Sequence, residues 1–116
     1  MAKIKPKIKK PEKRSDQKLF ELIEKSIKNE DYIFLPHAKA RLKERSISDL
    51  VVLDILEGKK GSKRKRNKAK DSFKAGEEDW NYCIEGVNPD DARIRIILTF
   101  NEKLMPIITV MWVGKE

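Results

Sequence analysis

The sequence predicts an α+β domain: a first helix, then strand, helix, helix and three strands, forming an antiparallel sheet with helices packed on one face. Two patterns indicate it. Apolar residues recur at helical spacing in the N-terminal half and alternate as in strands in the last third. With 116 residues the chain has the size of one domain, since domains usually take about 100–200 residues. We therefore expect a basic disordered tail over residues 1–14 and a single domain over residues 15–116.

The first expected helix covers residues 16–29. Ser15 is a good N-cap, and Asp16 places an acid in the first turn, where the helix dipole favours negative charge. Four apolar residues recur at the spacing of one helix face: Leu19, Leu22, Ile23 and Ile27. We expect this face to pack on the same domain, because an isolated helix of this length is marginal in water.

A short strand and two further helices follow. The apolar run 32–35 is suited to a strand, and Pro36 both ends it and favours the start of a helix that runs to about Arg45. Ser48 caps a third, largely apolar helix, which Gly58 ends.

The sequence of the C-terminal half predicts a long loop followed by three strands. Residues 59–79 have no periodic apolar pattern, which predicts a basic loop, and loops of this length are uncommon unless they are functional or disordered. Turn-forming residues then separate three strands, expected at 80–87, 93–100 and 104–113.

The last two strands predict a hairpin with a defined register. If residues 101–103 form a three-residue loop, Phe100 faces Leu104 and Arg95 lies opposite Thr109. A two-residue loop would shift the register by one. Alternation under the first register gives a core face of Ile94, Ile96, Leu98, Phe100, Ile108, Val110 and Trp112.

Positive charge is concentrated in two runs. The chain has 27 lysines and arginines against 19 acids, and its net charge is +8. Residues 1–14 carry +6 and residues 59–70 carry +8, which leaves −6 for the rest. Such runs indicate either solvated segments or contact with phosphate groups, where binding depends on salt. The candidate phosphate-binding residues of the second run are Lys59, Lys60, Lys63, Arg64, Lys65, Arg66, Lys68 and Lys70.

Composition excludes several classes. No run approaches the roughly 18 apolar residues that a membrane span needs, and no apolar stretch follows the basic N-terminus, so we expect a cytoplasmic protein without a membrane. Cys83 is the only cysteine, which excludes an internal disulfide and a cysteine-cluster zinc site. The paired acids at 77–79 and 90–91 suit solvated turns, so no metal or cofactor is expected.

One helix face combines the only histidine with two arginines. His37, Arg41 and Arg45 follow one another at intervals of four, so they form one stripe on the second helix. The helix N-terminus and the guanidinium groups disfavour a charged imidazole, which would leave it available as a base. Arginines beside it could hold a phosphate, an arrangement that suits metal-independent cleavage of RNA by its own 2′-hydroxyl. The alternative is that the histidine and both arginines are structural.

Trp80 and Tyr82 fall on one face of the first of the three strands. Such a face usually belongs to the core, but aromatic rings beside a basic loop can also stack on unpaired bases. The sequence alone leaves both interpretations open.

Residues 31–113 resemble a known family. The stretch from His37 to Ser48 resembles the pattern H-A-x-x-R-x-x-E-R-x-I-[ST] that opens a small bacterial family of domains of unknown function, number 4258, and an apolar helix ending in glycine follows in both. That family is similar to the RelE/ParE-like toxins, which implies a βααβββ order, a ribonuclease fold of the barnase/EndoU/colicin/RelE type and a partner antitoxin. The motif positions matched here are His37, Arg41, Arg45 and Thr109, and Arg95 is a looser match. The first helix, the tail and the basic loop depart from the pattern.

These observations predict a toxin-type endoribonuclease that acts without a metal on single-stranded RNA, such as mRNA on the ribosome. His37 would be the base or acid, Arg41 and Arg45 would hold phosphate, and Arg95 with Thr109 would contact the RNA backbone. The expected partners are RNA and a cognate antitoxin. Two alternatives remain: a non-catalytic RNA- or ribosome-binding module, and a protein that acts mainly through a protein partner.

Overall fold

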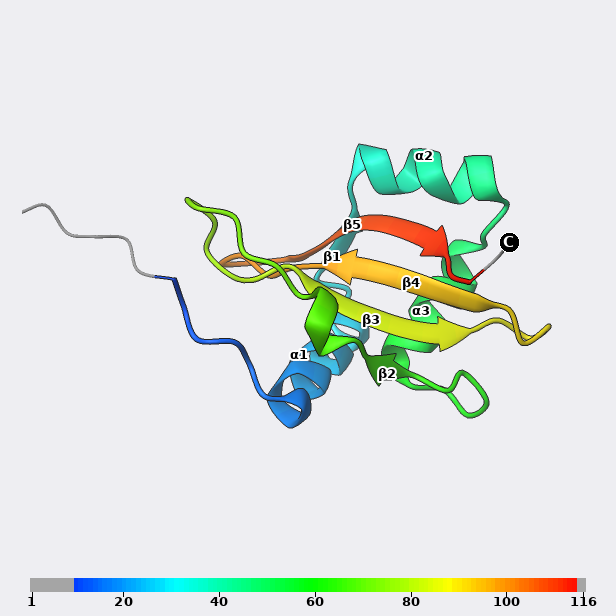
Figure 1. The fold of residues 1–116 in the computed structure, drawn as a ribbon, viewed down its shortest axis with the longest axis horizontal. Helices are drawn as coiled ribbons and strands as arrows, with labels where there is room; N and C mark the ends of the chain where they lie inside the picture. Colours follow the sequence, from blue (N-terminus) through cyan, green and yellow to red (C-terminus); the bar gives the residue numbers. More distant parts are fainter. Residues whose placement is uncertain (1–9, 115–116) are drawn as a thin grey trace, which may run out of the picture.

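The computed structural model describes residues 10–114, and its fold is of the α+β class expected from the sequence (Figure 1). Three helices, a short 3₁₀ helix and five strands follow one another along the chain. They are α1 (Asp16–Lys28), β1 (Tyr32–Phe34), α2 (Pro36–Arg45), α3 (Asp49–Glu57), β2 (Lys65–Arg66), η1 (Lys68–Lys70), β3 (Tyr82–Val87), β4 (Arg93–Leu98) and β5 (Met105–Trp112). The predicted helices are confirmed to within one residue at their ends.

The five strands form one sheet in the order β1-β5-β4-β3-β2. Strand β1 runs parallel to β5 and the other pairs are antiparallel, so the sheet is mixed and the expectation of an antiparallel sheet is wrong at this edge. The reason is topological. Parallel neighbours need a long crossover connection, and here α2, α3 and three strands separate β1 from β5.

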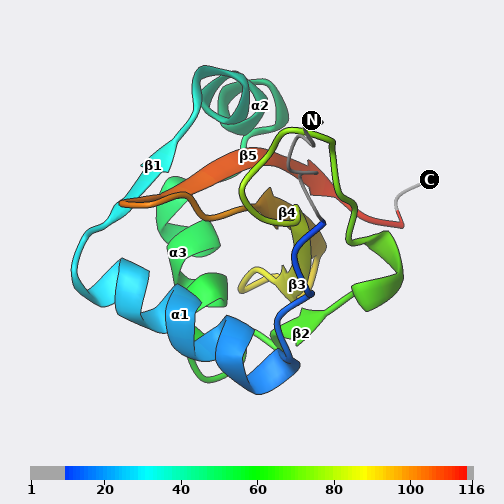
Figure 2. The ribbon, with the colours of Figure 1, turned by 90° about the vertical axis from the view of Figure 1, so that its left-hand side faces the viewer.

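Helices α1 and α3 cover one face of the sheet, and on the opposite side Figure 2 shows no α-helix but only the short 3₁₀ helix η1. Fully buried side chains from both helices meet the inward residues of β3, β4 and β5 in a single core. From the helices come Leu19, Ile23, Val52, Ile55 and Leu56; from the strands come Tyr82, Ile84, Ile94, Ile96, Leu98, Ile107 and Val110. The prediction that the first helix packs on its own domain is therefore confirmed.

Helix α2 lies along β5, where β1 does not cover that strand. Strand β1 pairs only with residues 105–107 of β5. Beyond them, α2 lies beside β5 where another strand would otherwise pair with it. The Arg45 guanidinium donates to the Val110 carbonyl at 2.8 Å, and the Trp112 indole N–H donates to the Arg45 carbonyl at 3.0 Å. These bonds fix the C-terminal end of α2 on the edge of the sheet.

The predicted hairpin register is wrong. The backbone N–H of Asn101 donates to the carbonyl of Leu104 at 3.0 Å, which makes a two-residue loop. The side-chain oxygen of Asn101 accepts from the backbone N–H groups of Lys103 and Leu104. A bulge after Ile97 then shifts the pairing once more, so Thr109 faces Ile97 rather than Arg95.

The same shift moves Ile107 into the core, although alternation placed it on the other face. Arg95 consequently lies opposite Met111.

Residues 10–14 pack on the domain and do not extend from it as a tail. The indole N–H of Trp80 donates to the Pro11 carbonyl at 2.7 Å, and the Arg14 guanidinium binds the Asp79 carboxylate, with Nε to Oδ2 at 3.0 Å. The other cations of the expected tail, from Lys3 to Lys9, lie outside the described residues. Within residues 10–114, no helix is long and apolar enough to cross a membrane.

Candidate nucleic-acid interface

The basic segment 59–70 contains the short strand β2, in which neighbouring side chains point to opposite faces of the sheet. Strand β2 pairs with β3 so that Lys65 faces Glu85 and Arg66 faces Ile84, which is a core residue. In the run Lys63-Arg64-Lys65-Arg66, side chains alternate along β2, so Arg66 points towards the helices and Lys65 away from them. Lys63 and Arg64 precede the strand, and Lys63 has a φ of 51°, so their contacts and not alternation show where they lie. The expectation of one continuous mobile loop is therefore wrong in this part.

The two arginines of this run anchor helix α1. Arg64 donates to the Leu56 carbonyl at 2.8 Å, pairs with Glu24 at 2.8 Å and lies 4.1 Å from the centre of the Phe20 ring. The Arg66 side chain is 2% exposed and binds Asp71 and Asp16, each at 2.8 Å. Both guanidinium groups are occupied by the protein, so the prediction that Arg64 and Arg66 bind RNA is not supported.

The sheet face opposite α1 and α3 gathers four cations, which we call the basic face: Lys63, Lys65, Arg93 and Arg95. The register sets Lys65, Glu85 and Arg95 in one row across β2, β3 and β4. Lys63, Lys65 and Arg93 line one hollow on this face. The basic face thus collects side chains that are up to 32 positions apart in the sequence.

Glu85 lies at the centre of the basic face. Its side chain is 3% exposed, and its Oε2 accepts from Asn67 Nδ2 at 2.9 Å and from Arg95 Nε at 3.0 Å. An Arg93 Nη2 atom lies 4.0 Å from Oε1. Burial alone would raise the pKa of Glu85, but these hydrogen bonds and the charges of both arginines outweigh it and hold the pKa below its usual value. Glu85 is therefore a carboxylate at neutral pH.

This carboxylate orients Arg95 on the face. The guanidinium binds Glu85 through Nε, while its side chain keeps 21% of its surface exposed. Within the described residues no hydrogen bond is made by its two Nη atoms. A guanidinium held in this way presents a planar pair of donors, the geometry that suits a phosphate.

The lysines of segment 59–70 are exposed. Lys60, Lys65, Lys68 and Lys70 have no carboxylate partner in the part of the chain that the structure describes, whereas Lys59 lies 3.6 Å from Glu57. Lys63 pairs with Asp91 at 3.0 Å, at the surface, where such a pair contributes little to stability. These side chains can therefore meet phosphate groups without breaking a buried ion pair.

The structure places the predicted catalytic stripe on α2 but engages its arginines elsewhere. His37 is exposed and makes no hydrogen bond or ion pair with the described residues. Arg41 pairs with Glu44 at 2.6 Å, and Arg45 is fixed on β5 as described above. No hydrogen bond or ion pair within residues 10–114 links His37 to Arg95 or Thr109.

Tyr82 and Trp80 pack within the domain. The prediction that Tyr82 stacks on RNA bases is wrong, because its side chain is buried. Tyr82 is fully buried and donates to Asp79 at 2.7 Å; burial first, and then this bond, raises the pKa of its hydroxyl to about 12. The Trp80 ring is covered by Lys10 and Lys13, at 4.9 and 4.8 Å from its centre.

Sequence reasoning missed three residues of the site: Asn67, Glu85 and Arg93. The two-residue spacing of Arg93 and Arg95 could have indicated a shared face, because side chains alternate along a strand. Nothing in the sequence indicates Glu85, which depends on the pairing of β3 with both neighbours.

No group of three histidine, cysteine or acidic side chains within residues 10–114 lies close enough to hold a metal ion. Comparisons of the chain with protein-family models, with curated proteins and with solved structures found no match.

Proposed function

We propose that this protein binds RNA and that the basic face contacts its phosphate backbone. The observation that carries the proposal is the convergence of four cations, two from segment 63–65 and two from β4, around the buried carboxylate of Glu85 on the sheet face opposite α1 and α3. The exposed lysines of segment 59–70 extend the same positive surface. RNA is favoured over DNA by the resemblance of residues 31–113 to ribonuclease-type toxins.

Binding would depend strongly on salt. Each phosphate neutralised by a lysine or arginine releases condensed counterions, so the logarithm of the affinity falls linearly with the logarithm of the salt concentration. Arg95 would contribute a two-donor contact, because Glu85 already holds its Nε. The lysines would contribute point charges of less defined geometry.

A matched pair of double variants tests the proposal. Lys63→Met with Lys65→Met removes two charges from the basic face, and Lys39→Met with Lys43→Met removes two exposed charges from α2. For a single-stranded RNA oligonucleotide, the first pair should lower the salt slope by about 0.7 for each phosphate that the protein no longer neutralises. The second pair should leave the slope near that of the wild-type protein. Equal slopes for the two double variants would contradict the proposal.

A second candidate is the toxin-type endoribonuclease, and the cluster of Glu85, Arg93 and Arg95 favours it. A carboxylate can accept the proton of a ribose 2′-hydroxyl as the 2′-oxygen bonds to phosphorus, and guanidinium groups stabilise the charge that develops on the phosphate. The bond to the 5′-oxygen then breaks, and that oxygen takes a proton from an acid. The products are a 2′,3′-cyclic phosphate and a 5′-hydroxyl. His37 is the competing candidate for base or acid.

The enzyme and the binding module differ in their products. Incubation of the purified protein with RNA in EDTA, followed by mapping of the ends, should give 2′,3′-cyclic phosphates if the protein cleaves. Loss of cleavage in Glu85→Gln with retention in His37→Ala would assign the base to the basic face, and the reverse result would assign it to α2. Binding without any cleavage would leave the binding module.

The antitoxin implied by the family resemblance is part of this second candidate. Expression of the chain with and without the neighbouring reading frame, scored for growth arrest and for copurification, tests it. Growth arrest that the neighbour relieves would support a toxin, and growth at the normal rate in both cases would contradict it.

A further inference from the structure

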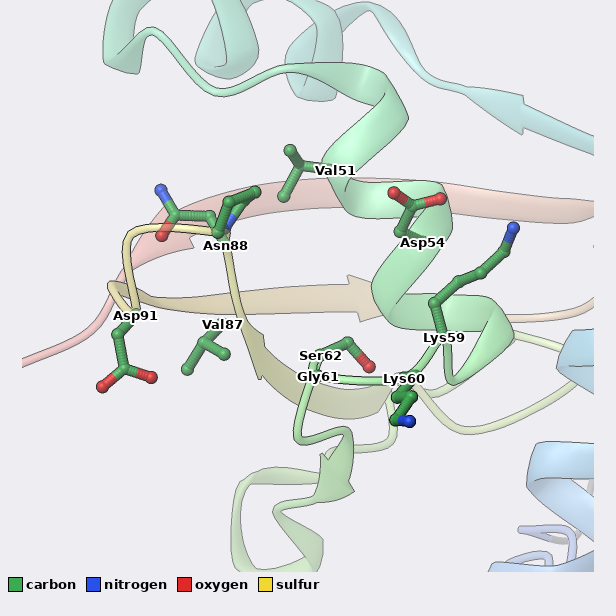
Figure 3. Close-up of a pocket in the computed structure, with 10 residues that line it drawn as sticks. Val51, Asp54, Lys59, Lys60, Gly61, Ser62, Val87, Asn88 and Asp91 are labelled. Atoms are coloured by element: carbon green, nitrogen blue, oxygen red, sulfur yellow. The ribbon is translucent and has the colours of Figure 1, made fainter.

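A pocket opens beside the basic face, between α3 and the turn that joins β3 to β4. Its volume is ≈ 320 Å³, at the lower end of the range of about 300–1,000 Å³ for small-molecule sites. Val51 and Asp54 project from α3 on one side, Asn88 lies across from them on the turn, and Ser62 lies beneath (Figure 3). Val87 and Pro89 complete an apolar part of the wall.

This pocket is continuous with the basic face. Val87 and Asp91 line both the pocket and the neighbouring hollow that contains Lys63, Lys65 and Arg93. The exposed ion pair of Lys63 with Asp91 stands at the boundary between them. A ligand that places a phosphate among these cations can therefore reach the pocket with its adjacent group.

Two polar groups in the wall have no protein partner. Within residues 10–114, no hydrogen bond or ion pair is made by the Asp54 carboxylate or by the Ser62 hydroxyl. A carboxylate only accepts hydrogen bonds, so Asp54 selects for hydroxyl or amino donors on a ligand. Lys59 and Lys60 at the edge of the pocket favour a ligand that carries negative charge nearby.

We propose that this pocket binds an unpaired nucleoside of the RNA whose phosphates lie on the basic face. The base packs on Val51, Val87 and Pro89, and a ribose hydroxyl or an amino group of the base donates to Asp54. A base inside a duplex is stacked and paired and cannot enter, so the pocket makes the protein selective for single strands. This inference rests on the proposed function and adds a specificity site to it.

The direction in which Asp54→Asn changes the RNA affinity distinguishes binding in the pocket from electrostatic attraction alone. Asp54→Asn removes an acid beside the RNA, so an electrostatic surface alone predicts tighter binding. Loss of a hydrogen bond to a charged acceptor predicts binding of single-stranded RNA weaker by about 10-fold, with the salt slope unchanged. Asp49→Asn is the control, because it removes the same charge from an exposed aspartate of the same helix.

The measurements are affinities for a single-stranded RNA, its perfectly paired duplex and the matching single-stranded DNA, with thermal melting of each variant as a check on folding. We expect Asp54→Asn to lower the affinity for single-stranded RNA and not for the duplex, and Asp49→Asn to lower none. Single-stranded DNA loses affinity in Asp54→Asn as well if a base amino group is the donor, and does not if the donor is the ribose 2′-hydroxyl. Equal wild-type affinity for single strand and duplex, or tighter binding by Asp54→Asn, would overturn the pocket assignment. If the basic-face double variant also leaves the salt slope unchanged, the proposed function itself fails.

Discussion

Arg66 and Lys65 are neighbours of the same charge, and the structure gives them opposite roles. The Arg66 side chain is 2% exposed and pairs with an Asp71 carboxylate that is 0% exposed, whereas Lys65 is exposed on the basic face. We therefore predict that Arg66→Met destabilises the fold and that Lys65→Met weakens RNA binding. Methionine is used in both because it keeps much of the length of the side chain and removes the charge and the donors.

The loss of folding stability in Arg66→Met follows from the buried Asp71 carboxylate that the substitution leaves without its partner. Breaking a buried ion pair by removing one partner costs about 3–5 kcal/mol, since the other charge stays buried. Asp71 keeps one hydrogen bond, from the Cys83 backbone N–H at 2.9 Å, and has Lys13 at 3.8 Å, so we expect the lower end of that range. For a domain of this size this is a fall in melting temperature on the order of 10 °C.

Lys65→Met should change the stability by less than about 0.5 kcal/mol, because it is a surface substitution away from any buried partner. Urea denaturation and thermal melting measure the first effect, and salt-dependent RNA binding measures the second. Equal loss of stability in the two variants would refute the alternation on which the basic face depends. The assignment of Lys65 to the basic face would also be refuted if the salt slope of RNA binding fell in neither variant.

Three further substitutions test the packing and the buried titratable groups. Gly86→Ala should destabilise by about 1–3 kcal/mol in urea, since its Cβ would lie 2.5 Å from Ile55 Cγ2 and 2.8 Å from the Ser62 carbonyl oxygen; unchanged stability would contradict this packing. The pKa of Glu85 is lowered on folding, so its contribution is present above the unfolded pKa and is lost as the pH falls through the folded pKa. Stability curves from pH 7 to 3 should therefore fall less in Glu85→Gln than in the wild-type protein. The pKa of Tyr82 is raised from 10.0 to about 12, so the unfolded state ionises first and stability falls between these values; Tyr82→Phe should remove that alkaline loss, and an identical loss in both proteins would exclude Tyr82 as its source.

The parts of the fold that the sequence predicts correctly depend on local chemistry. Ser15 and Ser48 cap α1 and α3 through their side chains, and Gly58 ends α3 in the left-handed conformation with a φ of 73°. Pro36 occupies the first turn of α2. Each of these signals acts within one helical turn, so it can be read without knowing the rest of the structure.

The errors concern features that depend on contacts distant in the sequence. The side chain of Asn101 organises a two-residue loop, and the bulge after Ile97 changes which residues face each other, so the predicted strands exist but their predicted register is wrong. The parallel pairing of β1 with β5 depends on where α2 and α3 direct the chain. Neither can be obtained from alternation within a single strand.

The roles of the cations in the candidate site also could not be predicted from the sequence alone. A count of residues treats the eight cations of segment 59–70 as equivalent, but Arg64 and Arg66 pair with acids of α1 while Lys63 and Lys65 are exposed, which divides the central four into two anchors and two surface charges. The division also follows the chemistry of the side chains. Arg64 and Arg66 are the inward pair, and a guanidinium suits buried pairing because it is weakly hydrated and makes several bonds in a plane.

The carboxylate of Glu85 explains how four cations can stay close together before any ligand binds. Lys63, Lys65, Arg93 and Arg95 repel one another, and a buried negative charge among them lowers that repulsion. Glu85 binds Nε of Arg95, and no hydrogen bond within residues 10–114 uses its Nη atoms, so a phosphate can add to the arginine without competing for the same donor. Arg95 is therefore held in place before RNA binds, which reduces the ordering that its contact with a phosphate would otherwise require.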